Sequence, residues 1–174
     1  MVVEELRDKI LTPENFTEKD GVRLARSLYK QPASVDLVID EFLSEDLRLR
    51  QRISWVLMAF PSLDQFCLAP HIERLISILF NTNEDSLKRN ILRLLQIQPI
   101  PKAYHGKLID FCFKILEDKK EAVAIQVFAM TVVSNLAKPY PELLNELALL
   151  LEANYEYGTA GYKSRARKII SEIK

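Results

Sequence analysis

The sequence repeats one helical segment at nearly constant spacing, and this repeat constrains the fold more than any other feature. The segments "LRLRQRISWVLMAFP", "SLKRNILRLLQIQP", "AVAIQVFAMTVVSNLAKP" and "GYKSRARKIISEIK" align so that four residues coincide at spacings of 38, 37 and 37: Ser54, Leu92, Ala129 and Ala166. Three positions further on, every segment is apolar, at Leu57, Leu95, Val132 and Ile169. A helical unit that recurs at such a period predicts a solenoid, in which each unit buries its apolar face against its neighbours.

Prolines and helical periodicity divide the rest of the chain into further segments. The eight prolines lie mostly between apolar runs, where they stop helices because they lack a donor and clash with the preceding turn. Within the runs, such as "SVDLVIDEFL" and "HIERLISILF", apolar residues recur at helical spacing. No convincing period-2 strand interrupts them, so the pattern predicts an all-α chain.

Each repeated helix follows a partner helix that starts near residue 34, 71, 104 or 142. Another pair at the N-terminus, at roughly 2–11 and 17–30, extends the series to five. We therefore predict one domain over residues 1–174, an α–α superhelix of about five helix pairs. The pairs are expected near 1–32, 33–62, 68–100, 102–139 and 141–174.

The stretch "AVAIQVFAMTVVSNLAKPYPELLNELALLLE" resembles the HEAT/armadillo superfamily in its order of an apolar second helix, a turn and a proline that opens the next repeat. The resemblance covers roughly residues 34–174, although the period is somewhat below the usual HEAT length of about 40. The tetratricopeptide alternative has a shorter period and a signature that this sequence lacks. Membership of this superfamily implies that second helices line a concave binding face.

Composition excludes several classes of protein. Lys+Arg and Asp+Glu both number 24, so no global basic field holds the chain on nucleic acid or anionic lipid. The N-terminal "MVVEELRDKI" lacks the apolar core of a secretory signal, and the most apolar run, 122–137, is shorter than a membrane span. We expect a cytoplasmic chain without a membrane segment. Cys67 and Cys112 are predicted to be reduced core residues, with a disulfide as the lesser alternative.

Charge is segregated along the chain even though the total is zero. Residues 34–47 and 140–156 carry mainly acids, whereas 47–63, 86–109 and 157–171 are predominantly basic. First helices therefore tend to be acidic and second helices basic. One interpretation is a positive concave face that binds an acidic protein segment or a nucleic-acid backbone. The other, which we rank first, is that the two signs neutralise each other between neighbouring helices.

Position and charge select the candidate contacts on the concave face. The single tryptophan lies among the basic residues of a second helix, where it is either part of the core or an exposed binding anchor. The predicted binding residues are Arg48, Arg52, Trp55, Arg89, Arg93, Lys163 and Arg167.

Signatures of catalysis are poor. His71 and His105 belong to no HExxH motif, and Pro70 breaks the helical spacing that would let Cys67 and His71 share a metal. The sequence has no nucleophile elbow and no kinase motif. We therefore predict a non-catalytic chain with no catalytic residue, metal or cofactor.

The stretch "GTAGYKSRARKII", residues 158–170, superficially resembles a phosphate-binding loop. Its glycines are too close together, a tyrosine precedes the lysine, and the preceding segment is helical, so it fails the motif. We expect Gly158 to adopt the left-handed conformation after one helix and Thr159 to cap the next. An apolar stripe of Tyr162, Ala166, Ile169, Ile170 and Ile173 would then seal the end of the core.

The favoured function is a macromolecule-binding scaffold, with a protein as the first expectation for the partner. The superfamily resemblance implies an alternative, because some HEAT-like proteins are alkylpurine DNA glycosylases with a basic concave face. This chain is not net basic, and its Trp55 has no evident acidic partner in the second helices. Nucleic acid therefore ranks second, and the oligomeric state is left open.

Overall fold

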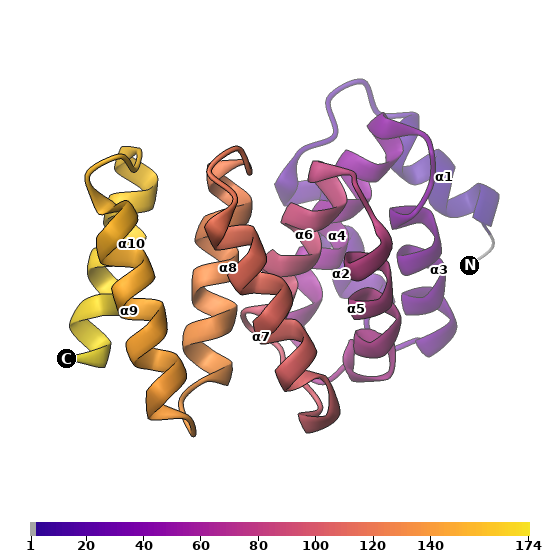
Figure 1. The fold of residues 1–174 in the computed structure, drawn as a ribbon. Coiled ribbons are helices and arrows are strands. Elements are labelled where there is room, and N and C mark those ends of the chain that lie inside the picture. The colour runs from indigo at the N-terminus through magenta and orange to yellow at the C-terminus, as the bar shows by residue number, and fades with distance from the viewer. Residues whose placement is uncertain (1–2) are drawn as a thin grey trace. The chain divides into compact units, whose positions relative to one another are not determined.

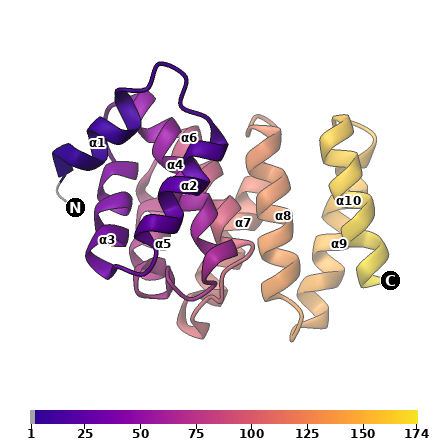
Figure 2. The same cartoon turned by 180° about the vertical axis from the view of Figure 1, so that it is seen from behind.

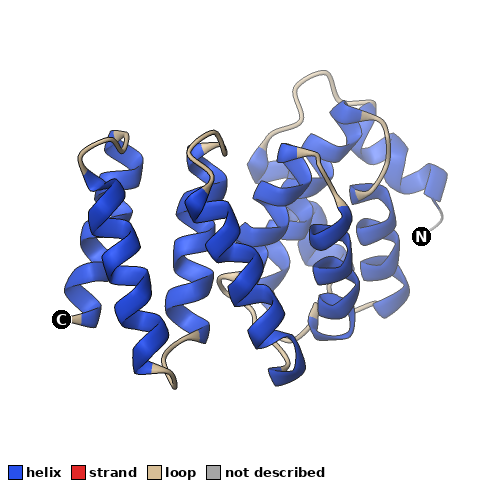
Figure 3. Cartoon of the chain, in the orientation of Figure 1, coloured by secondary structure: helices blue, strands red, loops and turns tan. Residues whose placement is uncertain are grey.

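The computed structural model describes residues 3–174, which form ten α-helices, one short 3-10 helix and no strand (Figures 1 and 3). The all-α prediction is therefore confirmed. Residue 2, at the start of the first predicted helix, lies outside the described residues. The helices group into an N-terminal unit that ends at His71 and a C-terminal unit that begins at Ile72.

The N-terminal unit is built around its longest helix, α4, which packs against the other three. Its helices are α1 (Val3–Leu11), α2 (Glu18–Leu28), α3 (Pro32–Phe42) and α4 (Leu47–Leu63). Helix α1 contacts α4, so the first pair departs from a simple hairpin. Thr17 and Asp20 form a capping box that starts α2 by satisfying its free amide groups.

The C-terminal unit stacks three consecutive antiparallel pairs. They are α5 (Ile72–Asn81) with α6 (Asp85–Leu95), α7 (Lys102–Glu117) with α8 (Val123–Leu136), and α9 (Pro141–Tyr155) with α10 (Ala160–Ile173). Helix α8 contacts both α6 and α10, and α7 contacts α9. Helices α7 and α9 face the viewer in Figure 1, and α8 and α10 face the viewer in Figure 2.

Prolines start helices at several of the predicted boundaries. Pro32 and Pro141 occupy the first turn of α3 and α9, where a missing N–H costs nothing, and Pro101 precedes α7. Pro61 departs from this pattern, because it lies inside the last turn of α4. The helix nevertheless continues for two residues, and the Asp64 amide donates to the Phe60 carbonyl oxygen at 2.9 Å.

The turn before α10 corrects one prediction. Gly158 does not have a positive φ, so it does not use the left-handed conformation. It is instead required for close packing, because an added Cβ would lie 2.5 Å from Cδ1 of Tyr162. Thr159 caps α10 as predicted and accepts a hydrogen bond from the Tyr162 amide. Tyr162, Ala166 and Ile169 are buried, whereas Ile170 and Ile173 are half-buried.

Candidate functional site

Arg52 in α4 is a buried structural residue. Its guanidinium donates hydrogen bonds of 2.8 Å to the carbonyl oxygens of Ile10, Pro13 and Glu14. These carbonyls lie at the end of α1 and in the following loop, where the last turn of a helix leaves acceptors without partners. Arg52 is only 8% exposed and three of its five N–H donors are engaged within the chain, so the sequence prediction that it lies on an exposed binding surface was wrong.

Trp55, the candidate anchor, lies one turn after Arg52 and is half-buried. Its ring stacks on Phe16, with ring centroids 6.1 Å apart and planes 10° apart, and the Arg52 guanidinium lies 5.8 Å from the Phe16 centroid on that ring's face. Gly21 of α2 also packs against Trp55, since an added Cβ there would lie 2.7 Å from the Trp55 Cβ. These contacts make Trp55 part of the packing between α2, α4 and the α1–α2 loop.

Arg48 is exposed in the first turn of α4. Its backbone amide and that of Leu49 donate to the Asp46 carboxylate, which caps the helix. The Arg48 side chain has no hydrogen bond or ion pair with another residue in 3–174. Its role in binding stays a prediction.

Helix α6 presents Arg89 and Arg93 one turn apart on its exposed side. The opposite side buries Leu87, Ile91 and Leu94. Within residues 3–174, neither guanidinium forms an ion pair or a hydrogen bond. Both therefore have their donors free for a partner molecule.

Helix α10 divides its basic residues between two sides of its buried stripe. On one side, Lys163 and Arg167 approach Tyr155 of α9: the Lys163 ammonium lies 5.8 Å from the ring centroid, and Arg167 donates to the hydroxyl at 2.8 Å. On the other side, Arg165 donates to Oγ1 of Thr131 in α8 at 2.9 Å. The structure therefore brings Arg165, rather than Lys163 and Arg167, to the side shared with α8.

The sequence contained a signal for this division. Residues at i, i+4 and i+7 share one side of a helix, so the stripe of Tyr162, Ala166 and Ile169 separates its basic neighbours into two groups. Lys168, three residues after Arg165, falls in the same group as Arg165 and lies 4.0 Å from Glu172. The basic run therefore forms two groups, and Arg165 belongs to the group beside α8.

We define the second-helix face as the exposed and half-buried side chains that α6, α8 and α10 share in the C-terminal unit. Asn135 of α8 donates to the Gln96 carbonyl oxygen at the end of α6, at 2.9 Å, and Thr131 of α8 accepts from Arg165. These two bonds join the three helices across the face. Its members are Arg89, Arg93, Ala124, Val127, Phe128, Thr131, Asn135, Arg165 and Lys168.

Neighbouring helices neutralise part of the segregated charge. In the N-terminal unit, Arg7 of α1 donates to Glu41 of α3 at 2.8 Å. In the C-terminal unit, Lys88 lies 2.7 Å from Glu121, and both side chains are largely buried. Burial disfavours the Lys88 charge, but the hydrogen bond and the charge of Glu121 outweigh it and raise the pKa of Lys88. Some basic side chains are therefore neutralised by ion pairs between helices, whereas others, such as Arg89 and Arg93, have no ion pair within residues 3–174.

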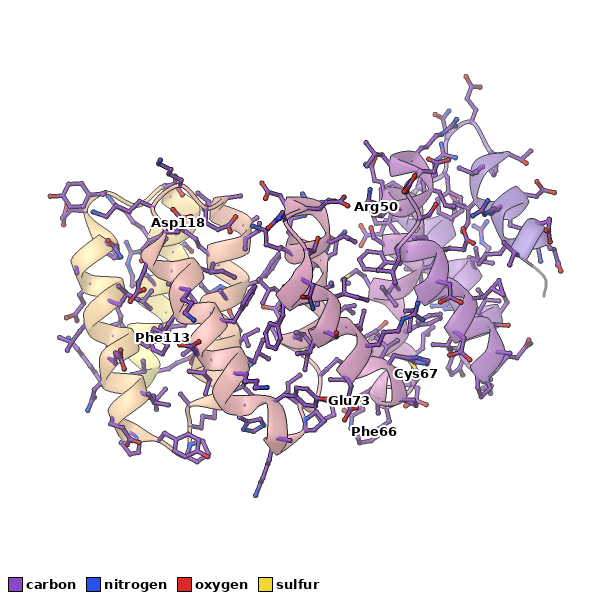
Figure 4. The ribbon with its side chains drawn as sticks, turned by 45° about the vertical axis from the view of Figure 1, so that its right-hand side comes forward. Arg50, Phe66, Cys67, Glu73, Phe113 and Asp118 are labelled. Atoms are coloured by element: carbon purple, nitrogen blue, oxygen red, sulfur yellow. The ribbon has the colours of Figure 1, made fainter. Side chains whose placement is uncertain are left out.

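The histidines and cysteines have structural contacts. His71 lies 3.4 Å from the Asp36 carboxylate, and Nε2 of His105 lies 2.9 Å from the Ile100 carbonyl oxygen. Cys67, labelled in Figure 4, and Cys112 are free thiols. Cys112 is buried as predicted, whereas Cys67 is only half-buried and so is not the core residue that the sequence predicted. Burial raises the pKa of Cys67 to about 11. Residues 3–174 contain no group of three or more His, Cys, Asp or Glu side chains placed to hold a metal ion.

The C-terminal unit contains a small cavity. This cavity of about 100 Å³ lies among Gln126, Asn154, Tyr157 and Tyr162. The Gln126 side-chain amide donates to the carbonyl oxygen of Asp118, which follows α7, at 3.0 Å. Burial raises the pKa of Tyr162, and the neighbouring Asn154 opposes this shift.

Within residues 3–174, no helix is both long enough and apolar enough to cross a bilayer.

Consecutive antiparallel helix pairs, with second helices in contact from one pair to the next in the C-terminal unit, define an α-helical repeat protein. The chain belongs to the HEAT repeat family, since the family model for the HEAT repeat domain matches residues 11–173. HEAT repeats generally serve as scaffolds for protein interactions. Searches of curated proteins and of solved structures gave no significant match.

Proposed function

We propose that the chain is a scaffold for protein–protein interaction and that its second-helix face binds an acidic segment of a partner. The observation that carries the proposal is the pair Arg89 and Arg93, which are exposed and have no ion pair within residues 3–174. Arginine binds carboxylates through two parallel hydrogen bonds, so an unengaged pair one turn apart suits an acidic chain.

The charge around these arginines also supports an acidic partner. Helix α8 carries no charged residue, and the acids of α6 and α10 are confined to Asp85 and Glu172. The second-helix face thus has an excess of positive charge. By contrast α9, the first helix of its pair, carries Glu142, Glu146 and Glu152 and no basic residue. A positive surface steers an acidic partner to one side of the unit.

Charge reversal on matched positions tests the proposal. We would compare Arg89→Glu/Arg93→Glu with the control Lys102→Glu/Lys107→Glu, which makes the same change at exposed positions of α7. The probe is a fluorescently labelled, glutamate-rich peptide, followed by anisotropy at low salt. Exposed ion pairs contribute up to about 1 kcal/mol each, so two reversals should weaken binding about tenfold or more. The control should change affinity by less than about twofold.

Two results would count against the proposal. Equal effects of the two double variants would show that binding follows net charge rather than this face. Binding of a short DNA duplex more tightly than the peptide, with a steep dependence on salt, would favour the nucleic-acid alternative.

A further inference from the structure

We infer that the partner segment carries a large apolar side chain between its acidic residues, and that this side chain contacts an uncharged strip on α8. This inference rests on the proposed function, because it assigns the middle of the same face. The α8 strip consists of Ala124, Val127, Phe128, Thr131 and Asn135.

The composition of the α8 strip is unusual for the outer side of a helix. A surface helix normally turns charged residues to solvent, yet α8 has none along its whole length. Its buried side consists of residues such as Ile125, Met130 and Val133. The remaining side leaves Val127 and Phe128 half-buried, with Ala124 exposed. The partly exposed Phe128 ring gives the strip an apolar centre.

Helices that carry arginines flank the α8 strip on both sides. Helix α6 contributes Arg89 and Arg93, and the Asn135–Gln96 hydrogen bond ties α8 to the end of α6. Helix α10 contributes Arg165, which is held beside the strip by its hydrogen bond to Thr131. An arginine has five N–H donors, so this single bond leaves others for a carboxylate.

This order of positive, apolar and positive groups has one complementary partner. Adjacent packed helices lie about 8–10 Å apart, so α6 and α10 are separated by about 16–20 Å across α8. Arg165 shortens that gap, because its side chain reaches Thr131 of α8. An extended segment rises about 3.3 Å per residue, so about four to six residues would place one carboxylate at each border and an apolar side chain between them. The phosphates of a nucleic-acid backbone carry a charge at every nucleotide, and those over the α8 strip would have no basic residue to pair with.

Three labelled peptides of equal length test the inference on the full chain. The anchored peptide has glutamates at both ends and a central phenylalanine, the unanchored peptide has serine in place of phenylalanine, and the neutral peptide has glutamines in place of glutamates. Partial burial of a phenyl group should give the anchored peptide about fivefold to tenfold higher affinity than the unanchored one.

The variant Phe128→Gln isolates the α8 strip from the charge of the face. It should abolish the preference for the anchored peptide and leave the affinity for the unanchored peptide within about twofold. The matched control Phe66→Gln changes an exposed phenylalanine of the N-terminal unit and should keep the preference. Circular dichroism shows whether each variant is folded, and Ala124→Gln, at an exposed position, provides a second disturbance of the strip.

The outcomes separate this inference from the proposed function. Equal affinity for the anchored and unanchored peptides, or a preference that survives both Phe128→Gln and Ala124→Gln, overturns the inference and leaves an acidic-segment scaffold intact. Failure of both acidic peptides to bind, or binding that Arg89→Glu/Arg93→Glu does not weaken, overturns the proposed function and the inference with it. Stronger binding of the neutral peptide than of the anchored one also overturns both.

Discussion

Replacing Arg52 by methionine should destabilise the N-terminal unit without disturbing its apolar packing. Methionine keeps much of the arginine stem but has no donor for the carbonyl oxygens of Ile10, Pro13 and Glu14. The variant therefore removes the contacts that attach the α1–α2 loop to α4. Arg52→Lys restores the charge but presents a compact ammonium in place of a planar fork, so it should recover about half of the loss.

The expected magnitude depends on what each carbonyl does once the arginine is gone. Hydrogen bonds to charged groups contribute about 1.5–3 kcal/mol each. Ile10 is fully buried, so its carbonyl bears the full loss, whereas Pro13 and Glu14 are exposed residues whose carbonyls regain water. Counting the first bond fully and the other two in part gives about 3 kcal/mol for Arg52→Met.

Urea denaturation followed by tryptophan fluorescence measures this loss in the right place. Trp55 is the only tryptophan in the chain and stacks on Phe16 beside Arg52, so its emission reports the N-terminal unit. The control Arg48→Met alters an exposed arginine on the same helix and should change the free energy of unfolding by at most about 0.5 kcal/mol. If both variants unfold at the same urea concentration, the buried contacts of Arg52 do not stabilise the unit and our reasoning is wrong.

Three further predictions concern the C-terminal unit. Gly158→Ala should cost about 1–3 kcal/mol in thermal denaturation, because its methyl group would lie 2.5 Å from a tyrosine ring, whereas Gly106→Ala in open space should gain about 0.5–1 kcal/mol. The pKa of Lys88 is raised by its pairing with Glu121, so the stability from this pair is complete below the ordinary lysine pKa of 10.5 and is lost as the pH rises through the raised value. Urea midpoints of the wild type and Lys88→Met should therefore converge in strong alkali, and a constant difference would contradict this. Burial raises the pKa of Cys112, so a thiol reagent at neutral pH should modify it only after denaturant is added.

The repeat was predictable because it depends on positions rather than on particular contacts. Leu57, Leu95, Val132 and Ile169 are all buried in their respective units, as the aligned apolar column required. Helix starts could also be predicted, since Thr159 and Pro141 each begin a helix within one turn of their own position. The prediction of a left-handed Gly158 was wrong. A position can require glycine because φ is positive or because a side chain would clash with a neighbour, and only the position of the Tyr162 ring distinguishes these two causes.

The contacts of the arginines were harder to predict from the sequence, because aligned positions in a repeat differ in the residues that lie next to them. Arg52 and Arg93 are both basic residues of second helices, yet Arg52 meets the carbonyls of a loop that only the first pair supplies, and Arg93 is left exposed. Arg167 of α10, in turn, reaches Tyr155 on its own partner helix, α9. A charge pattern along the sequence therefore indicates which helices are basic. Neighbouring loops and helices decide which of those charges are already engaged within the chain. They engage Arg52 and leave Arg89 and Arg93 without an ion pair within residues 3–174.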